Sequence, residues 1–353
     1  MTTLSANDQL VDLFMERSID ILRLEAGTRN KVFKILNDLE GDLVAQIAKV
    51  DPTEGQQQRR LQKLLDTVRT AIRAGYRNNS QLMAREIREI IDQESTWTAN
   101  ALNQSIGIDF VKIGFTRSQL EALASDVMIQ GAPSADWWSR QAAGLAERFA
   151  DQMRIGVAAG ETNAELVART RQVMEISRNS AMRLVRSSVQ TAANAGREVT
   201  YANNDDIIEA LQWHATLDTR TSFWCITRDG HLYNNDAEHK PQDDGPPWLQ
   251  GPGAIHWNCR STSVPVLKSW QSLGIAADEL PNGTRASMDG QVPADQTFEG
   301  WLKKQSEGRQ NAVLGVEVAK LWRDGRLSFS DLLNAAGQPL TTEELKAKAE
   351  RKD

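Results

Sequence analysis

Proline is nearly absent from the first two thirds of this 353-residue chain, where only Pro52 and Pro133 precede residue 241. Because proline removes a backbone donor and breaks helices, its scarcity permits long helices. Apolar residues recur at helical spacing in three rows of the first hundred residues, which predicts amphipathic helices packed into a core, or alternatively a surface for partner helices. The rows are Val32, Ile35, Leu36, Leu39, Leu43 and Ile47; Leu61, Leu64, Leu65, Val68 and Ile72; and Met83, Ile87, Ile90, Ile91 and Trp97. We expect breaks between helices at 27–28, 51–52 and 78–80.

The pattern changes after residue 205. Residues 207–215 partly alternate between apolar and polar, which predicts a strand, and we expect return strands within 222–234 and at 262–267. A loop rich in proline, glycine and aspartate follows at 240–253 and must be held by its neighbours. We expect an irregular arm at 269–296 and short helices beyond it.

These patterns together predict a mainly α protein with a small α+β module. Long N-terminal helices come first, then a compact block of short strands and loops, then a tail of short helices. The expected divisions are an N-terminal helical region at 1–110, a helical connector with arginine-rich helices at 111–204, the α+β block at 205–270 and a C-terminal arm at 271–353.

The overall composition is that of an ordinary soluble globular protein, with 25% charged and 40% hydrophobic residues. The net charge of −6 argues against a surface that is basic all round, although a local basic face remains compatible with it. The N-terminus lacks a basic segment followed by an apolar one, and no run of 18 apolar residues occurs, so we expect neither a signal peptide nor a membrane span. Two cysteines do not make a disulfide scaffold.

Residues 165–197 hold six arginines and only two acidic residues. Arg178, Arg183 and Arg186 are the candidates here for contact with DNA phosphates or with an acidic partner surface. The alternative is a solvated helix face.

All four histidines and both cysteines of the chain lie between residues 213 and 260. Cys225 and the pair His256 and Cys259 offer two thiols and an imidazole, which are ligands that zinc prefers. His231 is the nearest candidate for a fourth ligand, and the other candidates are His214, His239 and Asp218. Two alternatives stay open: both cysteines are buried as free thiols, or they form a disulfide.

Asp218, Arg220 and Arg260 form a second candidate group in the same block. A carboxylate and two guanidinium groups can lock loops together through paired hydrogen bonds, so we predict a structural clamp that fixes both ends of the loop at 234–253. As an active site the block is poor, because no serine or cysteine nucleophile stands beside a credible base and no glycine-rich phosphate loop follows a strand.

The 213–260 block resembles the signature of the phage head morphogenesis family, the Mu F-type minor head proteins. The resemblance rests on Trp213, Asp218, Arg220, Thr221, Cys225, Asp229, Gly230, Pro246, Pro247, His256, Asn258, Cys259 and Arg260. The stretch Asn194 to Arg197 and the tail from Pro293 to Leu332 are also similar to such proteins. The chain departs from the family pattern at Trp257, where proline is usual, and at 187–188, where the family often has a threonine and a glutamate.

The resemblance implies a minor capsid component acting structurally in head assembly. It implies a place in the virion, inside the head near the portal, after assembly in the host cytoplasm. The expected partners are the portal protein, capsid proteins and double-stranded DNA, with no membrane. The rival interpretation is an enzyme, a metal-dependent nuclease or an ADP-ribosyl-transfer-type enzyme, that uses the 218–260 cluster.

Overall fold

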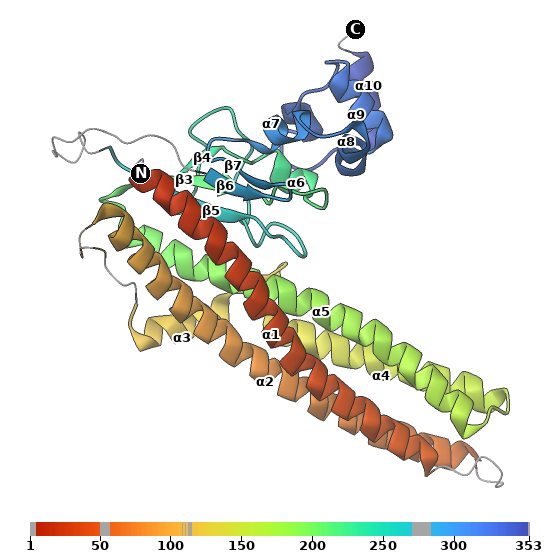
Figure 1. Cartoon of the computed structure of the whole chain (residues 1–353). Coiled ribbons are helices and arrows are strands. Elements are labelled where there is room, and N and C mark those ends of the chain that lie inside the picture. The colour runs from red at the N-terminus through yellow and green to blue at the C-terminus, as the bar shows by residue number, and fades with distance from the viewer. Residues whose placement is uncertain are drawn as a thin grey trace. The chain divides into compact units, whose positions relative to one another are not determined.

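The computed structural model describes residues 5–49, 57–107, 109, 111, 115–269 and 284–351. Its helices are α1 (Ala6–Ala48), α2 (Gln57–Ile106), α3 (Arg117–Asp126), α4 (Ser134–Ala158), α5 (Asn163–Ala202), α6 (Phe223–Ile226), α7 (Phe298–Lys303), α8 (Glu307–Leu314), α9 (Val316–Arg323) and α10 (Thr342–Glu350), with a 3-10 helix η1 (Phe329–Leu332). The expected fold class, mainly α with a small α+β module, is confirmed (Figure 1). None of these helices is both long and apolar enough to span a lipid bilayer.

The strands are short and form three small antiparallel sheets. They are β1 (Met128–Ile129), β2 (Ala132–Pro133), β3 (Ile208–His214), β4 (Leu232–Asn234), β5 (Thr262–Leu267), β6 (Thr284–Ser287) and β7 (Gly290–Pro293). β3 lies between β4 and β5, with Leu211 opposite Tyr233 on one side and Pro265 on the other. The strands expected at 207–215 and 262–267 are therefore present. The segment 222–234 differs from the expectation, because it begins with helix α6 and only its last residues form a strand, β4.

Two expected helix breaks are wrong. α1 runs through residues 27–28 and α2 runs through 78–80 without interruption. Thr28 lies buried within α1 and donates its hydroxyl to Glu86 of α2, and Asn79 is fully buried within α2. Packing of the two helices thus overrides the weak helix propensity of these residues. The third expected break, at 51–52, lies outside the described residues.

Residues 22–90 and 117–192 form one compact unit, made of parts of α1, α2 and α5 together with α3, α4 and the β1–β2 hairpin. In Figure 1 the long helices of this unit lie alongside one another. Apolar residues of the predicted rows, such as Leu36, Leu43 and Ile72, have no exposed surface. The rows therefore form the core of a helical bundle, as expected from their periodicity.

Residues 1–21, 91–116 and 193–353 form the other compact unit. Its core takes side chains from the N-terminal part of α1, such as Phe14, and from the sheet, such as Trp213. The short C-terminal helices add Phe298 and Trp322 to the same core. The segment expected as an irregular arm departs from that expectation, because residues 284–293 form the β6–β7 hairpin. Residues 270–283 of that arm lie outside the described part of the chain.

Candidate functional site: a buried cysteine–histidine cluster and its polar frame

Cys225, His256 and Cys259 meet at one point of the α+β block. Cys225 lies in the single turn of α6, and the other two lie in a tight turn in which Asn258 has a φ of 60°. Asparagine tolerates this left-handed conformation better than most residues. The Cys225 Sγ is 3.1 Å from the His256 Nε2 and 3.6 Å from the Cys259 Sγ. The two sulfurs are thus much farther apart than the roughly 2.05 Å of a disulfide bond.

A backbone contact sets the orientation of the His256 ring. Its Nδ1 donates a hydrogen bond to the carbonyl oxygen of Trp257 at 2.9 Å. The Nε2 therefore faces the cluster, 2.7 Å from the hydroxyl of Ser222. When the ring is neutral, this tautomer leaves the Nε2 lone pair available to a proton or a metal ion.

The pKa values of the two cysteine thiols are shifted in opposite directions. Burial raises the pKa of the Cys225 thiol, and the neighbouring Cys259 raises it further. Burial alone would also raise the pKa of Cys259, but hydrogen bonds from Cys225 and His256 hold it well below its ordinary value. The backbone N–H of Gly253 donates to the same sulfur at 3.2 Å. Cys259 is therefore the more acidic thiol of the pair and Cys225 the less acidic one.

The other histidines do not join this cluster. His231, the expected fourth ligand, places its Nδ1 2.8 Å from the carboxylate of Asp243. His214 bonds to its strand neighbour Gln212, and His239 lies beside a different carboxylate. Among the described residues, the group that could hold a metal ion consists of Cys225, His256 and Cys259.

A very small cavity adjoins the cluster. It has a volume of about 20 Å³ and is lined by residues that include Ser222, Cys225, His256 and Arg260. A single water molecule needs roughly 10–15 Å³ on this scale, whereas pockets for small molecules hold about 300–1,000 Å³. The cavity therefore has room for one water molecule and not for a nucleotide.

The second candidate group is a clamp between two residues. Both terminal nitrogens of Arg260 donate to the carboxylate of Asp218, at 2.5 and 2.8 Å. Burial would raise the pKa of Asp218, but the bonds from Arg260 lower it below the usual range. Arg220 contributes its backbone N–H to Asp218, while its side chain is 80% exposed. The Arg220 guanidinium also lies 3.7 Å from the Asp218 carboxylate, so both arginines pair with Asp218, and Arg260 forms the shorter and more buried pair.

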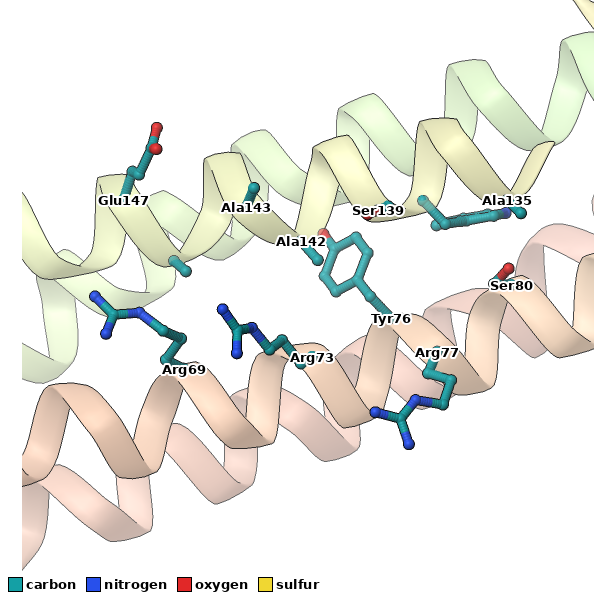
Figure 2. A pocket seen from close by; sticks show the side chains of 12 residues that line it. Arg69, Arg73, Tyr76, Arg77, Ser80, Ala135, Ser139, Ala142, Ala143 and Glu147 are labelled. Carbon is teal, nitrogen blue, oxygen red and sulfur yellow. The ribbon is translucent and has the colours of Figure 1, made fainter. Parts of the chain in front are cut away.

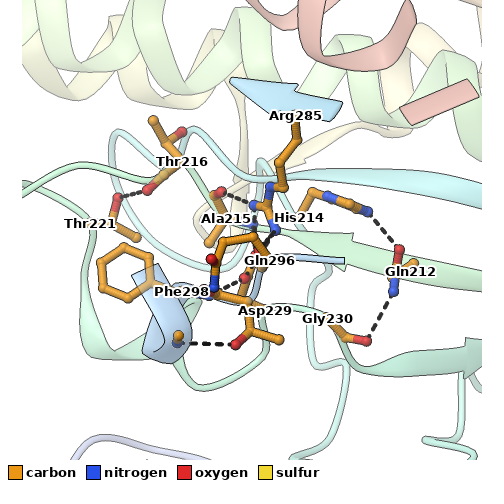
Figure 3. A network of polar contacts seen from close by, with 12 residues as sticks. Gln212, His214, Ala215, Thr216, Thr221, Asp229, Gly230, Arg285, Gln296 and Phe298 are labelled. Carbon is orange, nitrogen blue, oxygen red and sulfur yellow. Dashed lines mark hydrogen bonds and ion pairs between the residues drawn. The ribbon is translucent and has the colours of Figure 1, made fainter. Parts of the chain in front are cut away.

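A buried ion pair lies next to this clamp. The guanidinium of Arg285 in β6 donates to both oxygens of Asp229, at 2.9 and 3.1 Å, and the side chains are 2% and 0% exposed (Figure 3). Asp229 also accepts the backbone N–H groups of Ala215 and Phe298. One carboxylate therefore joins β3, the β6–β7 hairpin and α7. Arg285 is not among the site residues predicted from the sequence, although Asp289-Gly290, at the turn of its hairpin, is a recognised hairpin signal.

A buried arginine holds the long loop at 240–253. Arg228 has no exposed surface and donates to the carbonyl oxygens of Trp224 at 2.7 Å, Pro247 at 2.9 Å and Gly337 at 3.0 Å. Trp248 also enters the core, with its ring centroid 4.9 Å from that of Tyr233. The loop is therefore held at its middle as well as at its ends.

The Asn194 to Arg197 stretch of α5 contacts the second helix. Gly196 packs so closely on α2 that an added Cβ would lie 2.5 Å from the carbonyl oxygen of Ile91. Arg197 donates to the fully buried carboxylate of Glu94 at 3.0 Å and also to the hydroxyl of Thr262 in β5. The glycine thus permits a close helix contact, and the arginine ties that contact to the sheet.

The three arginines expected to contact DNA differ in their surroundings. Arg178 pairs with Glu40, and Arg186 lies 3.5 Å from Glu25, so two of them are engaged by carboxylates of α1. Arg183 is exposed. The structure thus leaves Arg183 as the exposed member of this set.

Another group of arginines lines a groove between α2 and α4. The groove has a volume of about 560 Å³ and is lined by Arg69, Arg73 and Arg77 of α2, with Glu147 on α4. Figure 2 shows Arg69 and Arg73 extending toward α4 beside the ring of Tyr76. The arginines recur every four residues, so they stand about 6 Å apart along one helix face. Arg73 and Arg77 make no ion pair within the part of the chain that the structure describes.

Comparison with known proteins identifies this region. A family model described as Phage Mu protein F like protein matches residues 147–264. This segment is Mu F-like. The Mu F-like segment begins within α4, ends within β5 and includes every residue of the 213–260 signature, so the expected resemblance to the phage head family is confirmed there. No curated protein and no solved structure matches the chain.

Proposed function

We propose that this protein is a minor head protein of a phage, which acts structurally in head assembly and contacts the portal and packaged DNA. The observation that carries the proposal is the Mu F-like match across α5 and the α+β block. Such a match supports phage head morphogenesis as the process and the virion as the location. The portal contact, the DNA contact and a position near the portal are the finer parts of the proposal.

The chemistry of the 213–260 block supports a structural role over an enzymatic one. Its polar residues are engaged in bonds between elements, as in the Asp229–Arg285 pair and the Asp218–Arg260 pair. The cavity of about 20 Å³ beside the cysteines has no room for a nucleotide or a sugar. The enzyme alternative rests on the contacts of His256 with Ser222 and Cys225, which set a nucleophile beside a base but have no pocket for a substrate beside them.

Co-expression of the full-length chain with the portal protein tests the portal contact. We use the full chain because each compact unit is built from separate segments, so a single cut anywhere within residues 22–192 divides both units. We expect the two proteins to elute together in size-exclusion chromatography, and the chain to appear in purified heads by mass spectrometry. Separate elution together with absence from heads would contradict the proposal.

The proposed DNA contact uses arginines on the surface of the helical bundle. Exposed Arg73 and Arg77 and half-exposed Arg69, which pairs with Asp66, line one groove, while Arg183 is the exposed member of the α5 set. Contact with phosphates releases counterions, so affinity should fall as salt rises, with a log–log slope of about −0.9 per phosphate neutralised.

Two triple variants locate that contact. We expect R69Q/R73Q/R77Q to lower both the affinity and the salt slope in a DNA-binding titration. The matched variant R178Q/R183Q/R186Q should have a smaller effect, because two of its arginines already bind carboxylates. The reverse order of effects would move the contact to α5, and no salt-dependent binding by the wild type would remove DNA from the proposal.

A further inference from the structure

We infer that Cys225, His256 and Cys259 bind one zinc ion in a structural site, which goes beyond the head-protein role proposed above. Three features of the cluster point to such a site: the position of three ligand atoms, the groups that orient them and the size of the space beside them.

The distances fit a tetrahedral zinc ion. With Zn–S bonds of about 2.3 Å and a Zn–N bond of about 2.0 Å, two sulfurs on one ion stand about 3.8 Å apart and a nitrogen stands about 3.5 Å from each sulfur. The observed Sγ–Sγ distance is 3.6 Å, and the Cys225 Sγ lies 3.1 Å from the His256 Nε2. The two buried sulfurs are therefore already in place. All three ligand atoms lie within 4.8 Å of one another, so an ion needs only a rearrangement of the half-buried His256 ring.

The surrounding hydrogen bonds are those that a zinc site uses. A zinc-bound histidine usually donates its other ring N–H to a backbone carbonyl or a carboxylate, which fixes the tautomer. The His256 Nδ1 does so with the carbonyl oxygen of Trp257. The Gly253 N–H points at the Cys259 sulfur, where it stabilises negative charge on a thiolate. Both groups are oriented by backbone atoms, so the arrangement does not depend on further side chains.

The fourth position is small and polar. The cavity of about 20 Å³ beside the cluster accommodates one water molecule, and the Ser222 hydroxyl lies 2.7 Å from the His256 Nε2. The fourth ligand is therefore a water molecule or Ser222. Catalytic zinc sites also have three protein ligands, but they open onto space for a substrate, which this cavity lacks. The ion would instead join α6 to the turn at 256–259, on the two sides of the long loop.

Two thiolates and an imidazole favour zinc over harder cations such as Mg²⁺ or Ca²⁺, which prefer oxygen ligands. Co²⁺ adopts the same tetrahedral geometry and gives visible spectra, so it serves as the probe. The full-length protein, purified after growth with added zinc, should contain about one zinc per chain by elemental analysis. Replacement by Co²⁺ should give the intense visible bands of a tetrahedral site and a thiolate-to-cobalt charge-transfer band.

Variants then assign the ligands. C225S, C259S and H256A should each lose most of the zinc, while H231A, whose ring faces Asp243 outside the cluster, should retain it. If a serine variant fails to fold, C259H keeps a ligand at that position and should retain the ion with a shifted cobalt spectrum. Zinc-free wild-type protein, a disulfide between the two cysteines, or full zinc content in C225S would each overturn the inference. Zinc content lost in H231A as well would show a non-specific site and overturn it too.

Discussion

Asp229 and Arg285 are 56 positions apart in the chain, yet both oxygens of the carboxylate accept hydrogen bonds from the guanidinium in a fully buried pair. Backbone N–H groups of Ala215 and Phe298 complete the shell of the carboxylate. Desolvation of two charges is costly, so the pair is useful only because these extra bonds accompany it. Its main effect is to fix the β6–β7 hairpin and α7 against the sheet.

Removal of one partner from this pair should destabilise the protein strongly. We expect R285M to lower the free energy of unfolding by about 3–5 kcal/mol, because it leaves a buried carboxylate without its cation. The double variant D229N/R285M should lose less than the sum of the two single variants. Urea unfolding measures both, with R309Q as the control, since Arg309 pairs with Asp289 at an exposed position. Equal stability of R285M and R309Q would contradict the assignment.

Arg228, which donates a hydrogen bond to the long loop at 240–253, gives a second prediction. R228M should release the loop at 240–253, because three carbonyl oxygens lose their donor, and the buried one at Gly337 alone costs about 1–3 kcal/mol. R228K should recover only part of the stability, since one ammonium group cannot match the planar fork of the guanidinium. Limited proteolysis should cleave R228M within the loop before the wild type. Unchanged cleavage in R228M would show that Trp248 alone suffices to hold the loop.

The close approach of α5 to α2 predicts that substitution by alanine has different effects on stability at two helical glycines. G196A should destabilise the protein, because the new Cβ would meet the backbone oxygen of Ile91 at 2.5 Å and backbone cannot move aside cheaply. G41A, also within a helix but with nothing within 4 Å of an added Cβ, should be neutral or stabilising by about 0.5–1 kcal/mol. Thermal unfolding of both variants decides, and a stable G196A would refute the contact.

Stability below neutral pH should depend on His214. Burial, with the nearby Arg285 cation, holds the pKa of His214 well below its ordinary value of about 6.5. The folded state thus keeps the ring neutral while the unfolded state takes up a proton. This linkage is absent well above pH 6.5 and lowers stability as the pH falls through that value, by about 1.4 kcal/mol at pH 5.5. H214Q should show a smaller loss of stability between pH 8 and pH 5.5 in urea unfolding; an identical loss would place the titrating group elsewhere.

In the Asp218–Arg260 clamp the titrating group is a carboxylic acid, which is charged in the folded state, whereas His214 is neutral there. The folded pKa of Asp218 lies below its ordinary value because Arg260 stabilises the carboxylate, so the contribution of the pair is complete above about pH 5 and is lost as the pH falls below about 4. R260Q should remove about 1.5–3 kcal/mol at pH 7 and flatten this acid dependence. R220Q should change little, since its side chain is 80% exposed. A larger effect of R220Q than of R260Q would contradict the observed pairing.

The sequence by itself determined the helical core and the composition of the candidate site. Helical periodicity of apolar residues predicts which faces are buried, because every helix of this length must cover its apolar side. The collection of all histidines and cysteines into residues 213–260, together with the Mu F-type signature, indicated where the chemistry lies. The sequence pattern also predicted strand β5 at its observed bounds, Thr262–Leu267.

Only the tertiary structure decided which of these residues act together. The histidines share one block, yet His256 alone meets the cysteines, because a tight turn with Asn258 in the left-handed conformation brings positions 256 and 259 toward α6. Arg285 and Arg228 find their partners across 56 and 109 positions, a separation at which no local pattern constrains pairing. Tertiary packing also decided that helices α1 and α2 continue through 27–28 and 78–80. Local propensities of a few tenths of a kcal/mol per residue decide nothing where burial of long apolar faces contributes several kcal/mol.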